Sequence, residues 1–267
     1  MLMKIGLESF SAYQVASIRI LSAGLVLSPF LWKAWKAIPK EKRGTVILSG
    51  WLGSFFPAFL FCIAETRIDS SLAAILNSLT PLSTILLGVA FFQLTASKEK
   101  WLGVVIGLIG LMLLILPSGS GISNSSLPYA FLVLLATVLY ALNVNMVGRK
   151  LQGIGSLEIA SLAFRMLTPA ALMVLISSNF FHMPTSGLGY WKSFIAASTL
   201  GIIGTAFASI LFYMLLKKSG PLFASMVTYG IPFVAVILGW LGGESIGLLQ
   251  MGALFLILGG VYLANKK

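Results

Sequence analysis

Two stretches of this sequence decide its fold. Residues 50–93 read GWLGSFFPAFLFCIAETRIDSSLAAILNSLTPLSTILLGVAFFQ, and residues 201–244 read GIIGTAFASILFYMLLKKSGPLFASMVTYGIPFVAVILGWLGGE. At a shift of 151 positions they align without gaps, and nine positions are identical: Gly50/Gly201, Gly53/Gly204, Phe56/Phe207, Leu60/Leu211, Phe61/Phe212, Ala73/Ala224, Pro81/Pro232, Leu87/Leu238 and Gly88/Gly239. Apolar sequences match one another easily, but shared glycines and a shared proline rarely coincide by chance. We therefore interpret the two stretches as an internal repeat.

The composition places these stretches in a lipid bilayer. Hydrophobic residues make up 58% of the 267 residues, charged residues only 9%, and the mean hydropathy is +0.99. A soluble domain carries roughly 25% charged residues, so this chain could not cover a water-exposed surface. Continuous apolar runs of about 20 residues cross the hydrocarbon core as helices, and the sequence predicts an all-α membrane protein. We expect nine spans, near residues 13–32, 45–65, 70–92, 101–116, 129–147, 159–177, 194–216, 222–241 and 248–264.

The basic residues predict how these spans are oriented. Thirteen of the 18 Lys and Arg residues fall at one set of alternate span ends, and only Lys4, Arg67 and Lys192 fall at the other set. Because cytoplasmic loops carry the excess of Lys and Arg, we expect a multi-pass protein of the cell (inner) membrane with a cytoplasmic C-terminus. The net charge of +11 then reflects topology, and we expect no nucleic-acid partner.

This orientation turns one repeat upside down relative to the other. The loop between spans 45–65 and 70–92 is expected outside, whereas its aligned partner at residues 217–220 is expected inside. Inverted repeats are typical of secondary transporters, in which two similar halves rock about a central site. We expect residues 1–116 to form a first repeat with four spans and residues 129–267 a second repeat with five. The alternative is a duplication that only built a stable bundle.

The uneven number of spans predicts that a first helix is missing. The partner of the 129–147 span would lie before Met1, and residues 1–12 look like the exit from such a helix. A truncation or a misplaced start codon would produce this pattern. The expected architecture is therefore an inverted-repeat helical bundle of ten helices that lacks the first.

Motifs in both repeats resemble those of a known family. Residues 71–81 (SLAAILNSLTP) resemble the fourth-helix signature of the EamA-type drug/metabolite transporters, and residues 220–232 (GPLFASMVTYGIP) resemble the matching ninth helix. Residues 243–244 (GE) and the Gly-rich residues 252–260 fit the turn and the last helix that follow in the family. The resemblance implies a ten-helix inner-membrane carrier with both termini in the cytoplasm, often an exporter of amino acids or other small metabolites.

Polar residues at matching depth in the two repeats are candidates for the wall of a substrate cavity. Asn77 and Thr84 lie about one turn before and after Pro81 and share a helix face. Thr228 is the repeat partner of Asn77, and Tyr229 follows it. These groups fit hydrogen bonding to a substrate near the midplane, or alternatively hydrogen bonding between helices.

Further candidates for the cavity wall come from two other patterns. Tyr140 and Asn143 share one face of their span at i, i+3 spacing. Trp51, Phe55 and Phe207 could supply aromatic walls for an apolar or planar solute. The alternative for these aromatic residues is a place in helix packing or in the interfacial belt.

Prolines and charges inside spans are the remaining candidates. Pro81 and Pro232 each remove one backbone hydrogen bond in mid-span, and such breaks line a cavity, act as hinges or only kink a helix. Arg19 and Arg165 align at a shift of 146 and match arginines often found in the second and seventh helices of the family. Charge within a span is rare and usually functional, so we expect a role in substrate binding or gating; snorkelling to the interface is the alternative.

These patterns favour a secondary transporter that moves a small organic metabolite, such as an amino acid, by alternating access, most simply as an exporter. We expect no enzyme activity, because an enzyme acting on lipid-linked groups would need clustered His, Asp or Glu residues and only scattered ones occur. We also expect no metal, because the single histidine, His182, lies in an external loop without ligand partners, and no cofactor, since the sequence carries no nucleotide-binding motif. That enzyme, a channel and a non-transporting truncated remnant are the rival interpretations.

Glycine stripes in the 101–116 span and in the last span allow close helix contacts. The stripe in the first of these spans comprises Gly103, Gly107 and Gly110, and the stripe in the last comprises Gly252, Gly259 and Gly260. They predict packing within the chain or, alternatively, a homodimer in the lipid bilayer.

Overall fold

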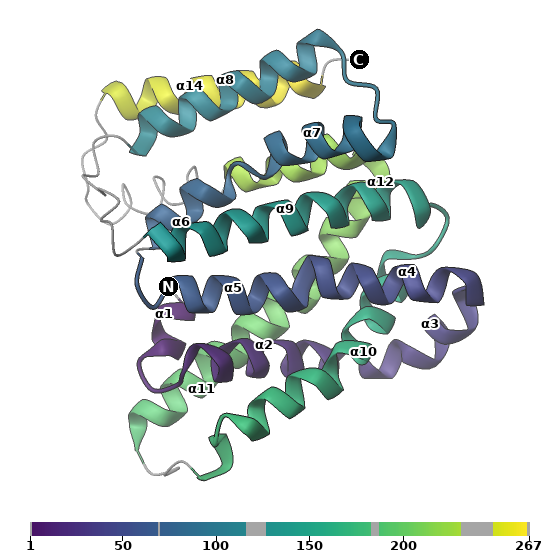
Figure 1. Ribbon diagram of the computed structural model, residues 1–267, viewed down its shortest axis with the longest axis vertical. Coiled ribbons are helices and arrows are strands. Elements are labelled where there is room, and N and C mark those ends of the chain that lie inside the picture. The colour runs from purple at the N-terminus through teal and green to yellow at the C-terminus, as the bar shows by residue number, and fades with distance from the viewer. Residues whose placement is uncertain (1, 69, 116–126, 183–186, 231–247, 266–267) are drawn as a thin grey trace.

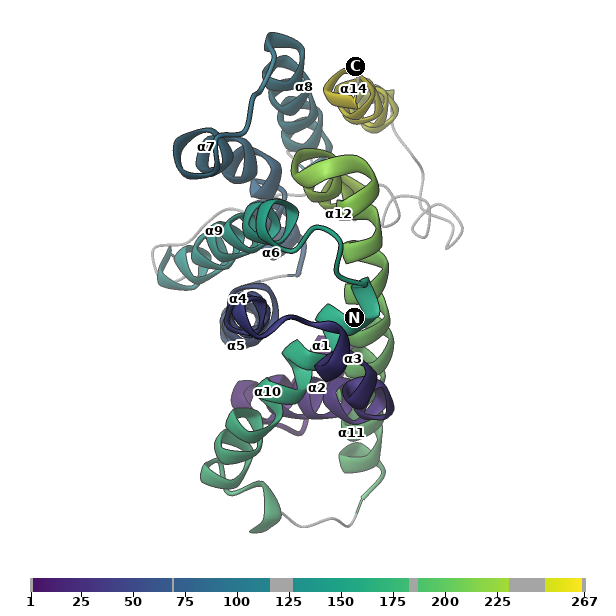
Figure 2. The same ribbon diagram turned by 90° about the vertical axis from the view of Figure 1, so that its right-hand side faces the viewer.

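Most helices of the computed structural model lie side by side in one stack, which α12 crosses obliquely (Figure 1). Turned by a quarter, the stack is seen nearly along its helix axes (Figure 2). No strand occurs in the part of the chain that the structure describes. That part comprises residues 2–68, 70–115, 127–182, 187–230 and 248–265.

The helices follow one another in two runs, separated by residues outside the described part. The first run comprises α1 (Leu2–Leu7), α2 (Ala12–Leu27), the 3-10 turn η1 (Ser28–Phe30), α3 (Leu31–Ala37), α4 (Lys40–Gly50), the π-helical η2 (Trp51–Phe55), α5 (Phe56–Ala64), α6 (Ser70–Asn77), α7 (Thr80–Phe92) and α8 (Lys98–Ile115). The second comprises α9 (Leu127–Lys150), α10 (Ser156–Ser177), the 3-10 turn η5 (Phe180–His182), α11 (Leu188–Gly201), the π-helical η6 (Ile202–Phe207), α12 (Ala208–Ser225), the 3-10 turn η7 (Met226–Tyr229) and α14 (Leu248–Asn265).

Length and composition make this chain a multi-pass helical membrane protein. Among the described residues, five continuous helical stretches are long and apolar enough to cross a bilayer: Ala12–Ala37, Lys40–Ala64, Leu127–Lys150, Ser156–Ser177 and Leu188–Tyr229. Two further apolar helical stretches are shorter, namely Thr80–Phe92 and Gly252–Ala264. The predicted span over 70–92 is two helices, α6 and α7. Most of the predicted span over 222–241, including Pro232, lies outside the described residues.

Helix ends that carry basic residues lie together on one side of the molecule. In Figure 1 the α3–α4 turn, the start of α8 and the end of α9 all lie on the right-hand side. These ends carry Lys36, Lys40, Lys98, Arg149 and Lys150. The charge asymmetry read from the sequence is therefore also an asymmetry in space.

The two aligned stretches run in opposite directions through the stack. α4 and α5 form one path that starts at the basic side, whereas α11 and α12 rise toward that side from the lower left (Figure 1). α12 then turns back at Gly220, whose φ of 83° suits a residue without a Cβ. Both paths contain a π-helical turn at the same aligned place, η2 at Trp51–Phe55 and η6 at Ile202–Phe207.

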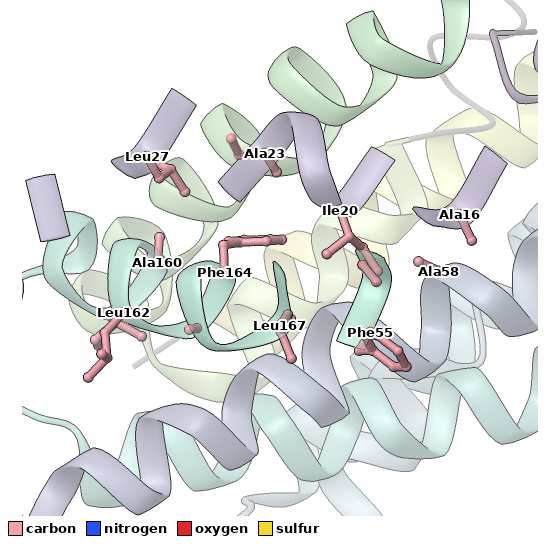
Figure 3. Packing of buried hydrophobic residues seen from close by; sticks show 14 of the residues in the cluster. Ala16, Ile20, Ala23, Leu27, Phe55, Ala58, Ala160, Leu162, Phe164 and Leu167 are labelled. Atoms are coloured by element: carbon pink, nitrogen blue, oxygen red, sulfur yellow. The ribbon is translucent and has the colours of Figure 1, made fainter. Parts of the chain in front are cut away.

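The largest buried cluster joins helices from the two runs. Figure 3 shows Ile20 and Ala23 of α2 beside Phe164 of α10, and each of these side chains is at most 1% exposed. Gly24 permits this approach, since a Cβ there would collide with the Thr168 hydroxyl of α10. The two runs therefore interlock, because a helix of the first packs against a helix of the second.

Glycines also bring α8 and α14 into backbone contact. A Cβ added to Gly103 would lie 2.6 Å from the Gly260 carbonyl oxygen, and one added to Gly260 would lie 2.6 Å from the Gly103 carbonyl oxygen. Gly107 and Gly110 face Tyr229 of η7 and the backbone of α14, respectively, in the same close manner. Within the described chain, the predicted stripe on α8 thus serves packing inside the molecule.

We expect Gly260→Ala to destabilise the protein, because its new methyl group would meet the backbone of α8, and overpacking of this kind costs about 1–3 kcal/mol. Gly259→Ala is the matched control, since a Cβ at that neighbouring position meets nothing within 4 Å. Thermal unfolding of the detergent-solubilised protein measures the difference. Equal midpoints for the two variants would contradict the close α8–α14 contact.

Candidate functional site

A cavity of about 510 Å³ lies between helices of the two runs. Small-molecule sites usually measure roughly 300–1,000 Å³. Its polar lining residues are Arg19, Ser54, Asn77, Thr80, Asn143, Thr205, Ser209, Ser225 and Thr228, and its aromatic ones are Tyr140, Phe212 and Tyr213. The wall thus combines a polar set with aromatic surface, as expected of a site for a small organic molecule.

The two π-helical turns contribute aligned residues to this wall. Gly53 and Ser54 come from η2, and Gly204 and Thr205, their partners at the shift of 151, come from η6. A π-turn inserts one extra residue into a helix and frees backbone groups, and such turns occur frequently at functional sites. The same local distortion therefore faces one cavity from both aligned stretches.

A second pair of irregular segments also faces the cavity. α6 ends at Asn77 and α7 starts at Thr80, whose hydroxyl donates a hydrogen bond to the Asn77 carbonyl oxygen at 2.5 Å. Pro81 occupies the first turn of α7, where its missing N–H removes no helical hydrogen bond. It therefore begins a helix at the break between α6 and α7, and the prediction that it removes a backbone hydrogen bond in mid-span is wrong. In the other repeat the 3-10 turn η7 brings Thr228, the partner of Asn77, to the same cavity.

The structure brings together five of the residues predicted from the sequence. Asn77, Tyr140, Asn143, Thr228 and Arg19 all line the cavity. They come from α6, α9, η7 and α2, so their proximity depends on the fold and not on local spacing.

Two predicted polar residues lie elsewhere and bond to backbone groups. The Thr84 hydroxyl is fully buried and donates a hydrogen bond to the Thr80 carbonyl oxygen at 2.8 Å. The Tyr229 hydroxyl donates to the Val104 carbonyl oxygen of α8 at 3.2 Å, and its ring packs in the cluster between α8 and α14. Tyr229 thus bonds one helix to another, the alternative that the sequence left open, whereas the Thr84 hydroxyl bonds within its own helix.

The predicted aromatic walls and the second intramembrane arginine also lie outside the cavity lining. The rings of Trp51 and Phe55 contact each other with centroids 4.4 Å apart, and Phe55 belongs to the buried core. Phe207 follows Thr205 by two positions, which turns it to the other face, and it is 59% exposed. Arg165 is exposed on α10.

Sequence reasoning missed several lining residues that a closer use of the repeat would have found. Ser54 and Thr205 each follow an aligned glycine and align with each other at the shift of 151. Tyr213 and Ser225 carry no such signal, because only the tertiary fold aims them at the cavity.

In the described part of the chain, no three His, Cys, Asp or Glu residues gather where they could hold a metal ion.

Two asparagines on α9 have contrasting surroundings. Asn145 is 2% exposed, and its amide donates hydrogen bonds at 2.9 Å to the carbonyl oxygens of Thr84 on α7 and Ala141 on its own helix. Asn143 is 3% exposed, packs against Gly53, and its Oδ1 atom has no hydrogen-bond partner among the described residues. Asn145 thus bonds α9 to α7, and the Asn143 side chain bonds Tyr213 of α12 but keeps a buried Oδ1 atom without a partner among the described residues.

Comparison with known proteins fits this geometry. The model of the EamA-like transporter family matches residues 1–116 and 127–266. The chain belongs to the EamA-like transporter family. One solved crystal structure superposes with a TM-score of 0.73 over 97% of this chain and 90% of its own, at 17% identity, which shows a shared fold.

Relatives of this EamA-like chain carry transporter names. It is 28% identical over 266 residues to the uncharacterized inner membrane transporter YedA of Escherichia coli (strain K12), covering 98% of this chain and 84% of YedA. It is 22% identical over 204 residues to the S-adenosylmethionine uptake transporter of Rickettsia felis, covering 76% of this chain and 65% of that protein. The EamA-like protein is therefore a membrane transporter.

Replacing the two asparagines separately should produce different defects. Asn145→Ala removes a hydrogen bond to the backbone of another helix and is expected to destabilise the protein by about 1 kcal/mol. Asn143→Ala removes a side-chain hydrogen bond to Tyr213 of α12, but it also removes a buried oxygen without a partner among the described residues, so stability should stay closer to wild type. Thermal unfolding in detergent separates the two. A larger loss for Asn143→Ala would contradict the assignment of Asn145 as the fastening residue.

Proposed function

We propose that this protein is a secondary transporter that moves a small organic metabolite, such as an amino acid, outward through the cavity by alternating access. One observation carries the proposal: both repeats face the cavity with the same pair of irregular backbone segments. η2 and η6 form one aligned pair, and the α6–α7 break and η7 form the other.

Irregular backbone inside a membrane is tolerated where it is buried in protein or lines a cavity. Helices interrupted near the midplane form substrate sites in transporters built from inverted repeats. Two copies of the same weak point on opposite walls would let each half bend in turn and expose the cavity to one side or the other. We infer that residues 1–116 and 129–267 are these two halves.

We also infer that the basic side of the stack faces the cytoplasm, in the inner membrane. Its support is the gathering of basic helix ends on one side, which is the side that the positive-inside rule assigns to the cytoplasm. The C-terminus would then lie in the cytoplasm. The opposite directions of α4–α5 and α11–α12 would follow from an inverted repeat.

Purified protein in proteoliposomes tests the transport proposal. We expect saturable counterflow, in which labelled amino acids enter vesicles preloaded with the same unlabelled amino acids. Ala208→Trp places an indole in the cavity wall and should reduce this uptake at least tenfold. Ile203→Trp is the control, since Ile203 is 61% exposed and does not line the cavity. Uncoupled conductance would instead support a channel, and uptake unchanged by Ala208→Trp would contradict a path through this cavity.

Site-directed labelling tests the inverted topology. In a Cys62→Ala background, Arg67→Cys and Lys217→Cys should react with a membrane-impermeant maleimide from opposite faces of the membrane. Arg67 follows α5, whereas Lys217 lies near the end of the aligned α11–α12 path. Labelling of both from the same face would overturn the inverted arrangement.

A further inference from the structure

We propose that Arg19 binds a carboxylate group of the transported solute and that Asn143 accepts a hydrogen bond from a donor group of the same solute. The inference rests on the proposed transport function, because it names the chemical class of the solute. That class is a small organic acid that also carries an N–H donor and an apolar body.

A close backbone contact and a hydrogen bond fix the position of Arg19. A Cβ on Gly201 would collide with the Arg19 carbonyl oxygen, so the glycine lets α11 touch the backbone of α2 at this residue. The π-turn that starts at Ile202 then carries Thr205 to the arginine side chain. The Arg19 Nε donates a hydrogen bond to the Thr205 Oγ1 at 2.5 Å. One repeat thus holds the guanidinium that the other repeat supplies.

The charge of Arg19 has no partner among the described residues. No Asp or Glu belongs to the described lining of the cavity, and neither ion pair in the described chain includes Arg19. A charge inside a membrane protein is costly unless it is paired or hydrated. A guanidinium has five N–H donors, of which Thr205 takes one. Both terminal nitrogens are thus left for the two oxygens of a carboxylate, whose geometry they match.

Asn143 provides a second, independent polar group in the same wall. Asn143 is 3% exposed; its side chain hydrogen-bonds the side chain of Tyr213, while its Oδ1 lacks a hydrogen-bond partner among the described residues. A buried acceptor without a partner costs about 1–3 kcal/mol, so its retention points to a ligand that donates to it. Gly53 admits the amide to this position, because a Cβ there would collide with it.

The rest of the described wall suits an uncharged, partly apolar body. Tyr140 and Phe212 contribute aromatic surface, and the volume of about 510 Å³ leaves room for a side chain beyond the two polar groups. An α-amino acid satisfies all three features, with its carboxylate at Arg19 and its ammonium group at Asn143.

Arg165 provides an internal comparison for Arg19, because the two arginines align at a shift of 146. Arg165 aligns with Arg19 but is exposed on α10 and does not line the cavity. The repeat therefore places an arginine in both helices, and the tertiary fold brings only one of them to the cavity. Arg165 is thus the matched control for Arg19.

Binding to the detergent-solubilised full chain tests the inference, with thermal stabilisation as the readout. The probes are L-leucine and L-phenylalanine, their carboxamides, which lack the carboxylate, and 4-methylpentanoate and 3-phenylpropanoate, which lack the amino group. We expect wild type to bind at least one amino acid at least tenfold more tightly than the corresponding carboxamide. Arg19→Ala should abolish this preference, Arg19→Lys should retain part of it, and Arg165→Ala should leave it unchanged.

Asn143→Leu should weaken binding of the amino acids while leaving that of 4-methylpentanoate and 3-phenylpropanoate near wild type. Size-exclusion profiles show whether each variant is folded, and Arg19→Lys keeps the test decisive should Arg19→Ala fail to fold. The inference is overturned if wild type binds none of the acids, or if Arg19→Lys and Arg165→Ala bind them alike. Counterflow that transports the carboxamides as well as the amino acids, or better, would also overturn this inference, but the transport proposal would stand. Acid binding that depends on Arg19 without counterflow would instead overturn the transport proposal alone.

Discussion

Backbone groups inside a bilayer have no water to bond to, and this constraint governs where the helices of this protein can be irregular. A helix satisfies its own N–H and C=O groups, so a departure from it is tolerated where protein or a cavity covers the freed groups. In this chain η2, η6, η7 and the α6–α7 break all place residues in the wall of one cavity. The irregular backbone of these segments is therefore tolerated because it lines the cavity.

Small residues decide how closely the helices approach and hence which side chains meet. Gly24 brings α2 against α10, and Gly201 brings α11 against α2 at Arg19. Gly53 admits Asn143 of α9 in the same way. Within lipid the hydrophobic effect does not drive helices together, so such close contacts and a few hydrogen bonds hold the bundle together. The contact that builds the cavity wall is therefore of the same kind as the contact that holds the α8–α14 pair.

Aligned residues of a repeat need not share an environment. Arg19 lies at the cavity, whereas Arg165 is exposed on α10. Asn77 and Thr228 both reach the cavity, yet their neighbours differ, since Tyr229 turns away to bond α8. Interlocking of the two runs makes this difference possible, because each helix packs against partners that its counterpart does not have. The two aligned stretches therefore contribute different residues to the wall of the cavity.

The sequence by itself determined the helical membrane class, the family resemblance, and five of the residues that line the cavity. Hydropathy, charge placement and repeated glycines report local energetics, and these survive without knowledge of the fold. Only the tertiary structure showed that Pro81 begins a helix, that Thr84 and Tyr229 bond to backbone groups, and that Tyr213 and Ser225 join the wall. Which face of a helix lines a cavity depends on the helices packed against it. A π-turn also rotates that face, and the hydropathy of the sequence does not reveal the turn.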